Sequence, residues 1–141
     1  MPVDRDDELK SILELQTVAV VGCSRHRGKA AHEIPRYLQA QGYTIVPVNP
    51  HADRILGTRA YDSLAEIGQA VEIDIVDVFR PSDEVAGIVD AALSRDDVDT
   101  IWLQLGIHDD TAVARAERAG IRVVQDRCMK PEHRRLLGPE S

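Results

Sequence analysis

A small basic loop joins an apolar run to a helix-like pattern in the stretch AVVGCSRHRGKAAHEIPRYL, residues 19–38. Gly22 allows a tight turn and a close approach of the backbone to a ligand. Ser24 offers a hydroxyl to a phosphate oxygen, and the free amides at the start of the following helix point into the same space. Three cations would add charge-assisted hydrogen bonds to an anion: Arg25, Arg27 and Lys29. The loop therefore predicts a phosphate site.

The charge balance of the chain makes this local cluster informative. The formal net charge is −7, and the basic residues are fourteen arginines and three lysines. A net negative charge disfavours general binding to nucleic acids or anionic membranes. The alternative interpretation is that the three loop cations are solvated surface charges without a ligand.

Two common nucleotide-binding motifs are not matched by this loop. Residues 22–28 read GCSRHRG, which lacks the second glycine and the spacing of GxGxxG, and no GKS or GKT follows. The next apolar run ends at Asn49 and Pro50, where NAD-binding proteins usually carry an acidic residue for the ribose. The sequence therefore argues against a nicotinamide dinucleotide and against a Walker A loop.

Apolar runs and amphipathic patterns alternate along the chain, which predicts a parallel sheet with helices on both faces. We expect a Rossmann-like, doubly wound α/β fold with five main strands in the order 3-2-1-4-5. The third strand is expected at an edge, and Pro47 is expected to cause a bulge or an early strand end. Pro35 would mark a late helix start or a kink. The expected strands are residues 17–22, 44–50, 73–79, 100–106 and 121–126, and the main helices are residues 4–15, 29–41, 81–94, 109–119 and 130–137.

The length favours a single domain over residues 1–141, with residues 1–16 forming a helix that packs on a core of residues 17–137. No stretch is long and apolar enough to span a bilayer. The acidic beginning, MPVDRDDELK, has no apolar signal core. We therefore expect a cytoplasmic protein that does not bind membranes or nucleic acids.

In a doubly wound sheet the ligand crevice lies beyond the carboxyl ends of the strands. The residues that follow each strand are therefore the candidates for binding. Besides the first loop, with Gly22, Cys23 and Ser24, these are Asn49, Pro50, Phe79, Arg80, Gln104 and Gly106.

Several segments together resemble the stand-alone coenzyme A-binding proteins of bacteria and archaea, which are similar to the N-terminal domain of the succinyl-CoA synthetase α subunit. They are AVVGCSRHRGKAAHEIPRYL, GYTIVPVNP, VDVFRP, IWLQLGI and VVQDRCMKPEHRRL, in this order over most of residues 17–136. Cys23 departs from the family, which often has alanine there.

The resemblance implies a site for coenzyme A or an acyl-CoA. By position, the loop from Gly22 to Lys29 would hold phosphates, and Asn49 and Pro50 would border the adenosine. Phe79 and Arg80 would flank the nucleotide and pantetheine, with Arg80 as a phosphate partner. The last two candidates, Gln104 and Gly106, would line the pantetheine path.

No catalytic or metal-binding residue stands out. Cys128, with His133 five residues later, is either a reactive thiol or a half-buried structural cysteine, and the loose spacing favours the second interpretation. His108, followed by Asp109 and Asp110, suggests a metal ligand set, but a helix start with a capping aspartate explains it better.

The leading hypothesis is therefore a coenzyme A-binding module that is not catalytic alone. The alternative is a subunit of a CoA-linked ligase or acyltransferase that acts with a partner chain. A nucleotide sensor of the repressor type would need a DNA-binding domain, for which 141 residues leave no room. A protein partner and a homodimer both remain open.

Overall fold

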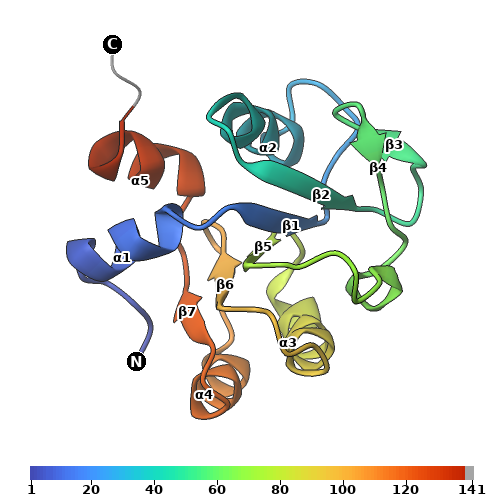
Figure 1. Ribbon diagram of the computed structural model, residues 1–141. Helices are drawn as coiled ribbons and strands as arrows, with labels where there is room; N and C mark the ends of the chain where they lie inside the picture. The colour runs from blue at the N-terminus through green and yellow to red at the C-terminus, as the bar shows by residue number, and fades with distance from the viewer. Residues whose placement is uncertain (139–141) are drawn as a thin grey trace.

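The computed structural model describes residues 1–138, and within them the chain forms a five-stranded parallel sheet covered by helices on both faces (Figure 1). The expected α/β class, doubly wound and Rossmann-like, is confirmed. The sheet strands are β1 (Thr17–Val21), β2 (Thr44–Val48), β5 (Ile75–Val78), β6 (Thr100–Leu103) and β7 (Arg122–Val124). The helices are α1 (Asp6–Leu13), α2 (Ala30–Ala40), α3 (Val85–Leu93), α4 (Asp110–Arg118) and α5 (Met129–Leu136).

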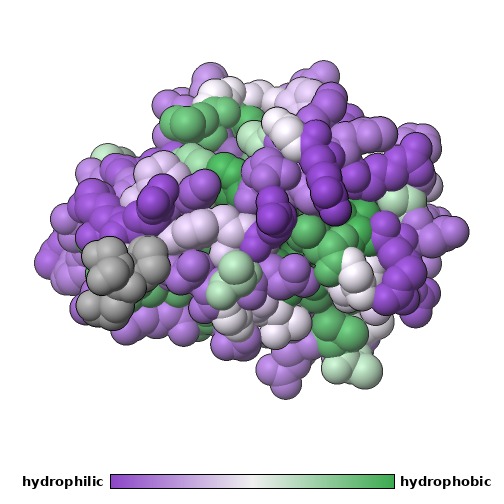
Figure 2. All heavy atoms as spheres, turned by 90° about the horizontal axis from the view of Figure 1, so that it is seen from above, coloured by the Kyte–Doolittle hydropathy of each residue, from purple (hydrophilic) through white to green (hydrophobic). Residues whose placement is uncertain are grey.

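Two apolar layers hold the helices against the sheet. One face packs against α3 and α4 through residues such as Val76, Val89 and Val113. The other face packs against α1, α2 and α5, with Leu9, Leu38 and Met129 among its buried side chains. Alternate residues of each strand enter opposite layers, as the pleat requires. In Figure 2 the surface seen from above is mostly polar, with one apolar area at the upper left and another right of centre.

The order of the strands differs from the expected one. The sheet runs β2-β1-β5-β6-β7, so the five main strands in chain order lie 2-1-3-4-5 and not 3-2-1-4-5. The third main strand, β5, pairs with β1 on one side and β6 on the other. All four of its residues are buried. The prediction that residues 73–79 form an edge strand is therefore wrong.

Pro47 explains why β2 takes the edge. Its carbonyl accepts a hydrogen bond from the Tyr61 amide at 2.9 Å, which means that its backbone polar groups face away from β1. Proline has no N–H to donate in that direction, so it is tolerated on an outer edge but not between two strands. The strand stays regular at Pro47, which pairs in register with Val20, so the expected bulge is absent.

The segment after β2 contains structure that the sequence did not predict. A short antiparallel pair, β3 (Arg54–Ile55) and β4 (Thr58–Arg59), forms between β2 and a turn of 3-10 helix, η1 (Leu64–Glu66). Tyr61 then bridges to Val48 at the outer edge of β2. Ser63 caps η1, because its side chain accepts a hydrogen bond from the Glu66 amide.

Two helix starts also follow the sequence. Asp109 caps α4 by accepting a hydrogen bond from the Ala112 amide at 3.0 Å, as expected for this aspartate. Residues 81–94 begin with a 3-10 turn, η2 (Ser82–Glu84), before α3 continues.

Among residues 1–138 no helix combines the length and hydrophobicity needed to cross a bilayer.

Candidate functional site

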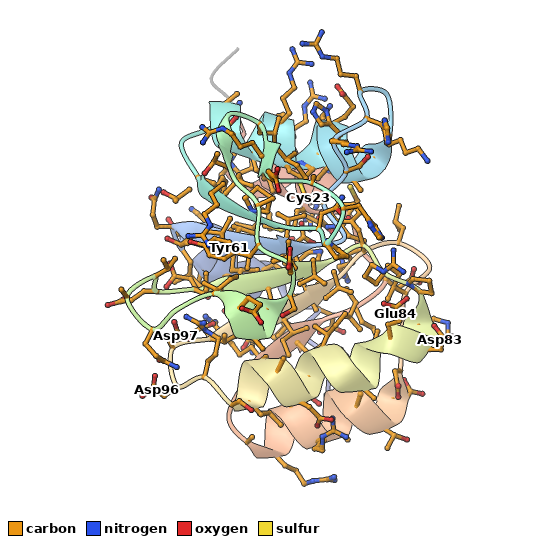
Figure 3. The ribbon with its side chains drawn as sticks, turned by 90° about the vertical axis from the view of Figure 1, so that its right-hand side faces the viewer. Cys23, Tyr61, Asp83, Glu84, Asp96 and Asp97 are labelled. Atoms are coloured by element: carbon orange, nitrogen blue, oxygen red, sulfur yellow. The ribbon has the colours of Figure 1, made fainter. Side chains whose placement is uncertain are left out.

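A cleft of about 780 Å³ opens at the carboxyl ends of β1 and β5. The strand order reverses between these two strands, because β2 lies on one side of β1 and the later strands of the sheet lie on the other. A doubly wound fold binds its ligands at this switch point. Figure 3 looks toward this edge, with Cys23 near α2 and with Asp83 and Glu84 at the start of α3.

Gly22 forms the floor of the cleft between the two strand ends. Its φ angle is +88°, which favours glycine over any residue with a side chain. A Cβ atom at this position would lie 2.8 Å from Cδ of Arg80 and 3.1 Å from the carbonyl oxygen of Phe79. The missing side chain therefore makes room for the stem of Arg80.

Hydrogen bonds hold the loop after β1 from two sides. The Asn49 side-chain amide donates to the Cys23 carbonyl at 2.9 Å, and Asn49 Oδ1 accepts from the His51 amide at 2.7 Å. Arg25 donates to the His51 carbonyl at 3.0 Å, so this cation bridges the two loops that border the cleft. Ser24 Oγ accepts from the His26 amide at 3.0 Å, which leaves the hydroxyl proton to donate elsewhere.

Among residues 1–138, no side chain at the N-cap position caps the N-terminus of α2. Lys29 occupies the N-cap position and makes no side-chain hydrogen bond to the helix. Glu33, one turn later, accepts instead from the Gly28 amide at 3.2 Å. The hydrogen bond of His32, followed by that of Gly28, lowers the pKa of the Glu33 carboxyl. A helix start of this kind suits an anionic ligand.

Arg80 is held in place by an acidic neighbour. Its Nε and Nη2 atoms donate to the two carboxylate oxygens of Glu84 at 3.1 and 2.7 Å. This hydrogen-bonded pair raises the pKa of Arg80 and lowers that of Glu84. A guanidinium has five N–H donors, so two bonds to Glu84 leave others for a phosphate.

Some of the predicted residues meet in the cleft and others do not. Those that line it are Gly22, Cys23, Ser24, Lys29, Asn49, Pro50 and Arg80. Outside its lining lie Arg25, Arg27, Phe79, Gln104 and Gly106. Cys23 is fully buried and packs in the apolar layer under α2, so its thiol is turned away from solvent.

Sequence reasoning missed one wall of the cleft. Gly87, Ile88 and Ala91 of α3 line it, together with residues of η1 and three acidic side chains, which are Asp62, Asp83 and Glu84. Ile88 has the helical spacing of the core residues Val85 and Val89, but it is only partly buried. The small residues at 87 and 91, one helical turn apart, are the signal that could have identified this face.

Gln104 lies in the interior and pairs with a buried acid. Its side-chain amide donates to Asp77 Oδ1 at 2.5 Å. Within residues 1–138 the other carboxylate oxygen of Asp77 has no hydrogen-bond partner. Burial raises the pKa of Asp77 to about 7. Asp74 does not join this pair, because its carboxylate accepts hydrogen bonds from the Gln16 and Thr17 amides.

Replacing Asp77 with asparagine is expected to change how stability depends on pH. The unfolded carboxyl ionises near pH 3.8, whereas the folded one keeps its proton up to about pH 7. Stability is therefore lost as pH rises between these values, by about 1.4 kcal/mol per unit. The variant has no such group, so urea unfolding should show a flatter slope between about pH 5 and pH 7. Equal slopes for both proteins would contradict the raised pKa.

The two thiols are poor nucleophiles at neutral pH. Burial raises the pKa of Cys23 to about 12, and the charge of Asp77 adds to the effect. Burial also raises the pKa of Cys128. The hydrogen bond from the Lys130 amide and the charge of Lys130 lower this pKa, but burial has the larger effect. This agrees with the structural interpretation of Cys128. The described residues contain no group of three or more histidine, cysteine or acidic side chains that could hold a metal ion.

The comparisons with known proteins agree with this geometry. Residues 16–134 match the family described as CoA binding domain, so the chain belongs to that family. It is similar to the uncharacterized protein YneT of Bacillus subtilis, with 37% identity over 89% of this chain and 92% of the relative.

A solved structure and a larger enzyme extend the comparison. The structure is a hypothetical protein from Pyrococcus horikoshii OT3, with 31% identity, a TM-score of 0.90 and coverage of 98% of this chain and 97% of that one. The enzyme is the ADP-forming acetate–CoA ligase of Methanocaldococcus jannaschii, 32% identical over 51% of this chain but only 10% of the ligase. The chain is thus related to one part of a multi-domain ligase.

Proposed function

We propose that this protein binds coenzyme A or an acyl-CoA in the cleft between β1 and β5, with the phosphates at the loop from Gly22 to Lys29. The observation that carries the proposal is the gathering of Gly22, Ser24, Lys29 and Arg80 around one cleft of a chain whose net charge is −7. Coenzyme A carries a pyrophosphate and a ribose 3′-phosphate, so it needs several cations and amides. Membership of the CoA binding domain family supports the same ligand.

The acidic side chains of the cleft support one orientation of the ligand. Asp62, Asp83 and Glu84 are among the residues that line it, with Asp83 and Glu84 just before α3. Phosphates avoid unpaired carboxylates, so they belong at the loop, at the α2 N-terminus and at Arg80, whose guanidinium neutralises Glu84, while uncharged parts of the ligand pass Asp62 and Asp83. The apolar face formed by Ile88 and Ala91 suits a pantetheine or an adenine ring.

The experiment is titration calorimetry with coenzyme A. NAD and ATP are titrated separately as comparison ligands. Coenzyme A should bind with a dissociation constant of about 1 μM or lower, more weakly as salt rises. Replacing Arg80 with alanine should weaken binding about tenfold, since a charge-assisted hydrogen bond contributes about 1.5–3 kcal/mol and part of it is already used by Glu84.

Arg5→Ala is the matched control for that variant. Arg5 is exposed and pairs with Asp7 on α1, outside the cleft, so its removal changes the net charge equally without touching the site. It should leave the affinity unchanged. Binding of NAD or ATP without coenzyme A would contradict the proposed function, and equal affinities of the two arginine variants would contradict the role of Arg80.

A second candidate function rests on the relation to ADP-forming acetate–CoA ligases. In this case the protein would serve as a subunit of a ligase or acyltransferase and act with a partner chain. The match to one part of a larger ligase is the observation that favours it. Acyl-CoA synthesis by the purified chain after addition of fractions from its own host, and not without them, would support this function.

A further inference from the structure

Pro35 stands in the second turn of α2, where proline disturbs a regular helix. The helix runs from Ala30 to Ala40, and Pro35 is buried within it. A proline there has no N–H to donate to the carbonyl four residues earlier, and its ring pushes that carbonyl aside. The carbonyl concerned belongs to Ala31.

The Ala31 carbonyl has a different partner, which comes from the loop after β1. The Ser24 amide donates to it at 2.9 Å. The bond that Pro35 cannot make inside α2 is thus replaced by a bond that ties the loop to the helix. Ser24 and Ala31 both line the cleft, so this bond lies in its wall.

The position of Ser24 determines where its hydroxyl can act. With the amide fixed on Ala31 and Oγ accepting from the His26 amide at 3.0 Å, the hydroxyl oxygen is held in place while its proton remains available to donate. A displacement of Ser24 would move this hydroxyl away from the α2 N-terminus, and the two could then no longer contact one anion together.

We propose that Pro35 is a positioning residue for the ligand site, which keeps the Ala31 carbonyl available to the Ser24 amide. The identity of the ligand as coenzyme A in this proposal rests on the proposed function. An N–H at position 35 would compete for the Ala31 carbonyl. Loss of the proline ring would also let that carbonyl turn back toward the helix axis, away from Ser24.

The test compares Pro35→Ala with Pro35→Gly. Both variants restore the N–H at position 35, but alanine favours a helix and glycine does not. In the ligand-free protein, the Ser24 amide should exchange its hydrogen at least about tenfold faster in both, as measured by NMR, because its acceptor is lost. The affinity for coenzyme A should fall about tenfold in both, even though their thermal stabilities differ.

Pro131→Ala is the matched control. Pro131 lies in the first turn of α5, where an N–H has no partner within the helix, so the change frees no carbonyl. It should leave both the Ser24 exchange rate and the coenzyme A affinity unchanged.

The exchange measurement separates this proposal from the proposed function, because it needs no ligand. Unchanged exchange of Ser24 in both Pro35 variants would overturn the positioning role whatever the affinity does. Faster exchange with unchanged coenzyme A affinity would overturn it as well. If the natural protein binds no coenzyme A, the proposed function fails, and the exchange rates alone decide whether Pro35 holds Ser24.

Discussion

Replacing Gly22 with alanine is expected to lower the affinity for coenzyme A about a hundredfold, equivalent to ~2.7 kcal/mol. Two effects combine in this variant. A side chain at φ +88° is strained, and the new Cβ would lie 2.8 Å from Cδ of Arg80. The Arg80 stem cannot move freely, because its guanidinium is held by Glu84. The loop and the arginine would therefore be pushed apart where, in the proposed site, a phosphate contacts both.

Gly42→Ala is the control for the backbone strain in that variant. Gly42 has a φ of +99°, but a Cβ there would meet no atom within 4 Å. It should lower the stability by about 1–2 kcal/mol and leave the affinity intact. Titration calorimetry and thermal unfolding of both variants separate the two effects. An affinity of Gly22→Ala equal to that of the natural protein would refute the close approach at this position.

A double variant shows whether the clash acts through the arginine. In an Arg80→Ala background the stem that meets the new Cβ is gone, so Gly22→Ala should cost less affinity than it does alone. The two changes are then coupled, as expected for residues in contact. If the two losses simply add, the damage comes from the loop alone and Arg80 has no part in it.

The positions of helices and strands could be read from local signals. A capping aspartate was predicted at Asp109 or Asp110, and Asp109 accepts a hydrogen bond from the Ala112 amide, three residues later. Gly42 and Gly120 each follow a helix and have positive φ angles, which is a common local signal of a helix end. These features depend on a few neighbouring residues, and this is why the sequence alone was enough.

The strand order was wrong because it depends on contacts between distant segments. Pro47 was read as a local defect of its strand, although the rule against proline between two strands already pointed to an edge position. The third strand was expected at an edge although it carries an acid, Asp77. It is instead the central strand β5, where Gln104, the residue after the neighbouring strand β6, is the partner of Asp77.

The sequence predicted which residues line the cleft where a backbone requirement determines their position. It failed where the direction of a side chain determines whether a residue reaches the cleft. Gly22 and Lys29 follow from the loop and the helix start, and both line the cleft. Gln104 was placed on the ligand path, yet its side chain turns inward to Asp77. Which residues of α3 line the cleft depends on the rotation of the helix about its axis. The apolar pattern of Val85 and Val89 determines this rotation only to within one residue.

Replacing Arg95 with methionine is expected to destabilise the fold by about 3–5 kcal/mol, because a buried ion pair loses one partner. Arg95 is 8% exposed. Its guanidinium donates to the Ile67 and Val71 carbonyls at 2.8 and 2.6 Å, and to both oxygens of Asp97. Asp97 also accepts from the Ile73 amide, so the cluster fixes the segment that leads into β5.

Arg115→Met is the control for Arg95→Met. Arg115 bonds to Asp90 and to the Ala86 carbonyl, but this pair is much more exposed than the Arg95 pair, with Arg115 at 38% and Asp90 at 71% exposure. Its loss should cost no more than about 1 kcal/mol. Urea unfolding compares the two variants, and similar costs would show that the buried cluster adds nothing beyond a surface pair.

The Arg95 cluster also links stability to the site. The segment it holds follows η1, whose Leu64 and Ala65 line the cleft, so loosening it removes support from the wall that faces the basic loop. Arg95→Met should therefore weaken coenzyme A binding in conditions where the protein is still folded, although Arg95 touches no ligand. The hydrogen bonds of Arg95 also lower the pKa of Asp97, so the natural protein should lose this stabilisation as pH falls through that pKa. In the variant this acid-dependent loss should be smaller, because only the backbone amides of Ile73 and Asp97 still stabilise the carboxylate, and an unchanged acid profile would contradict the assignment.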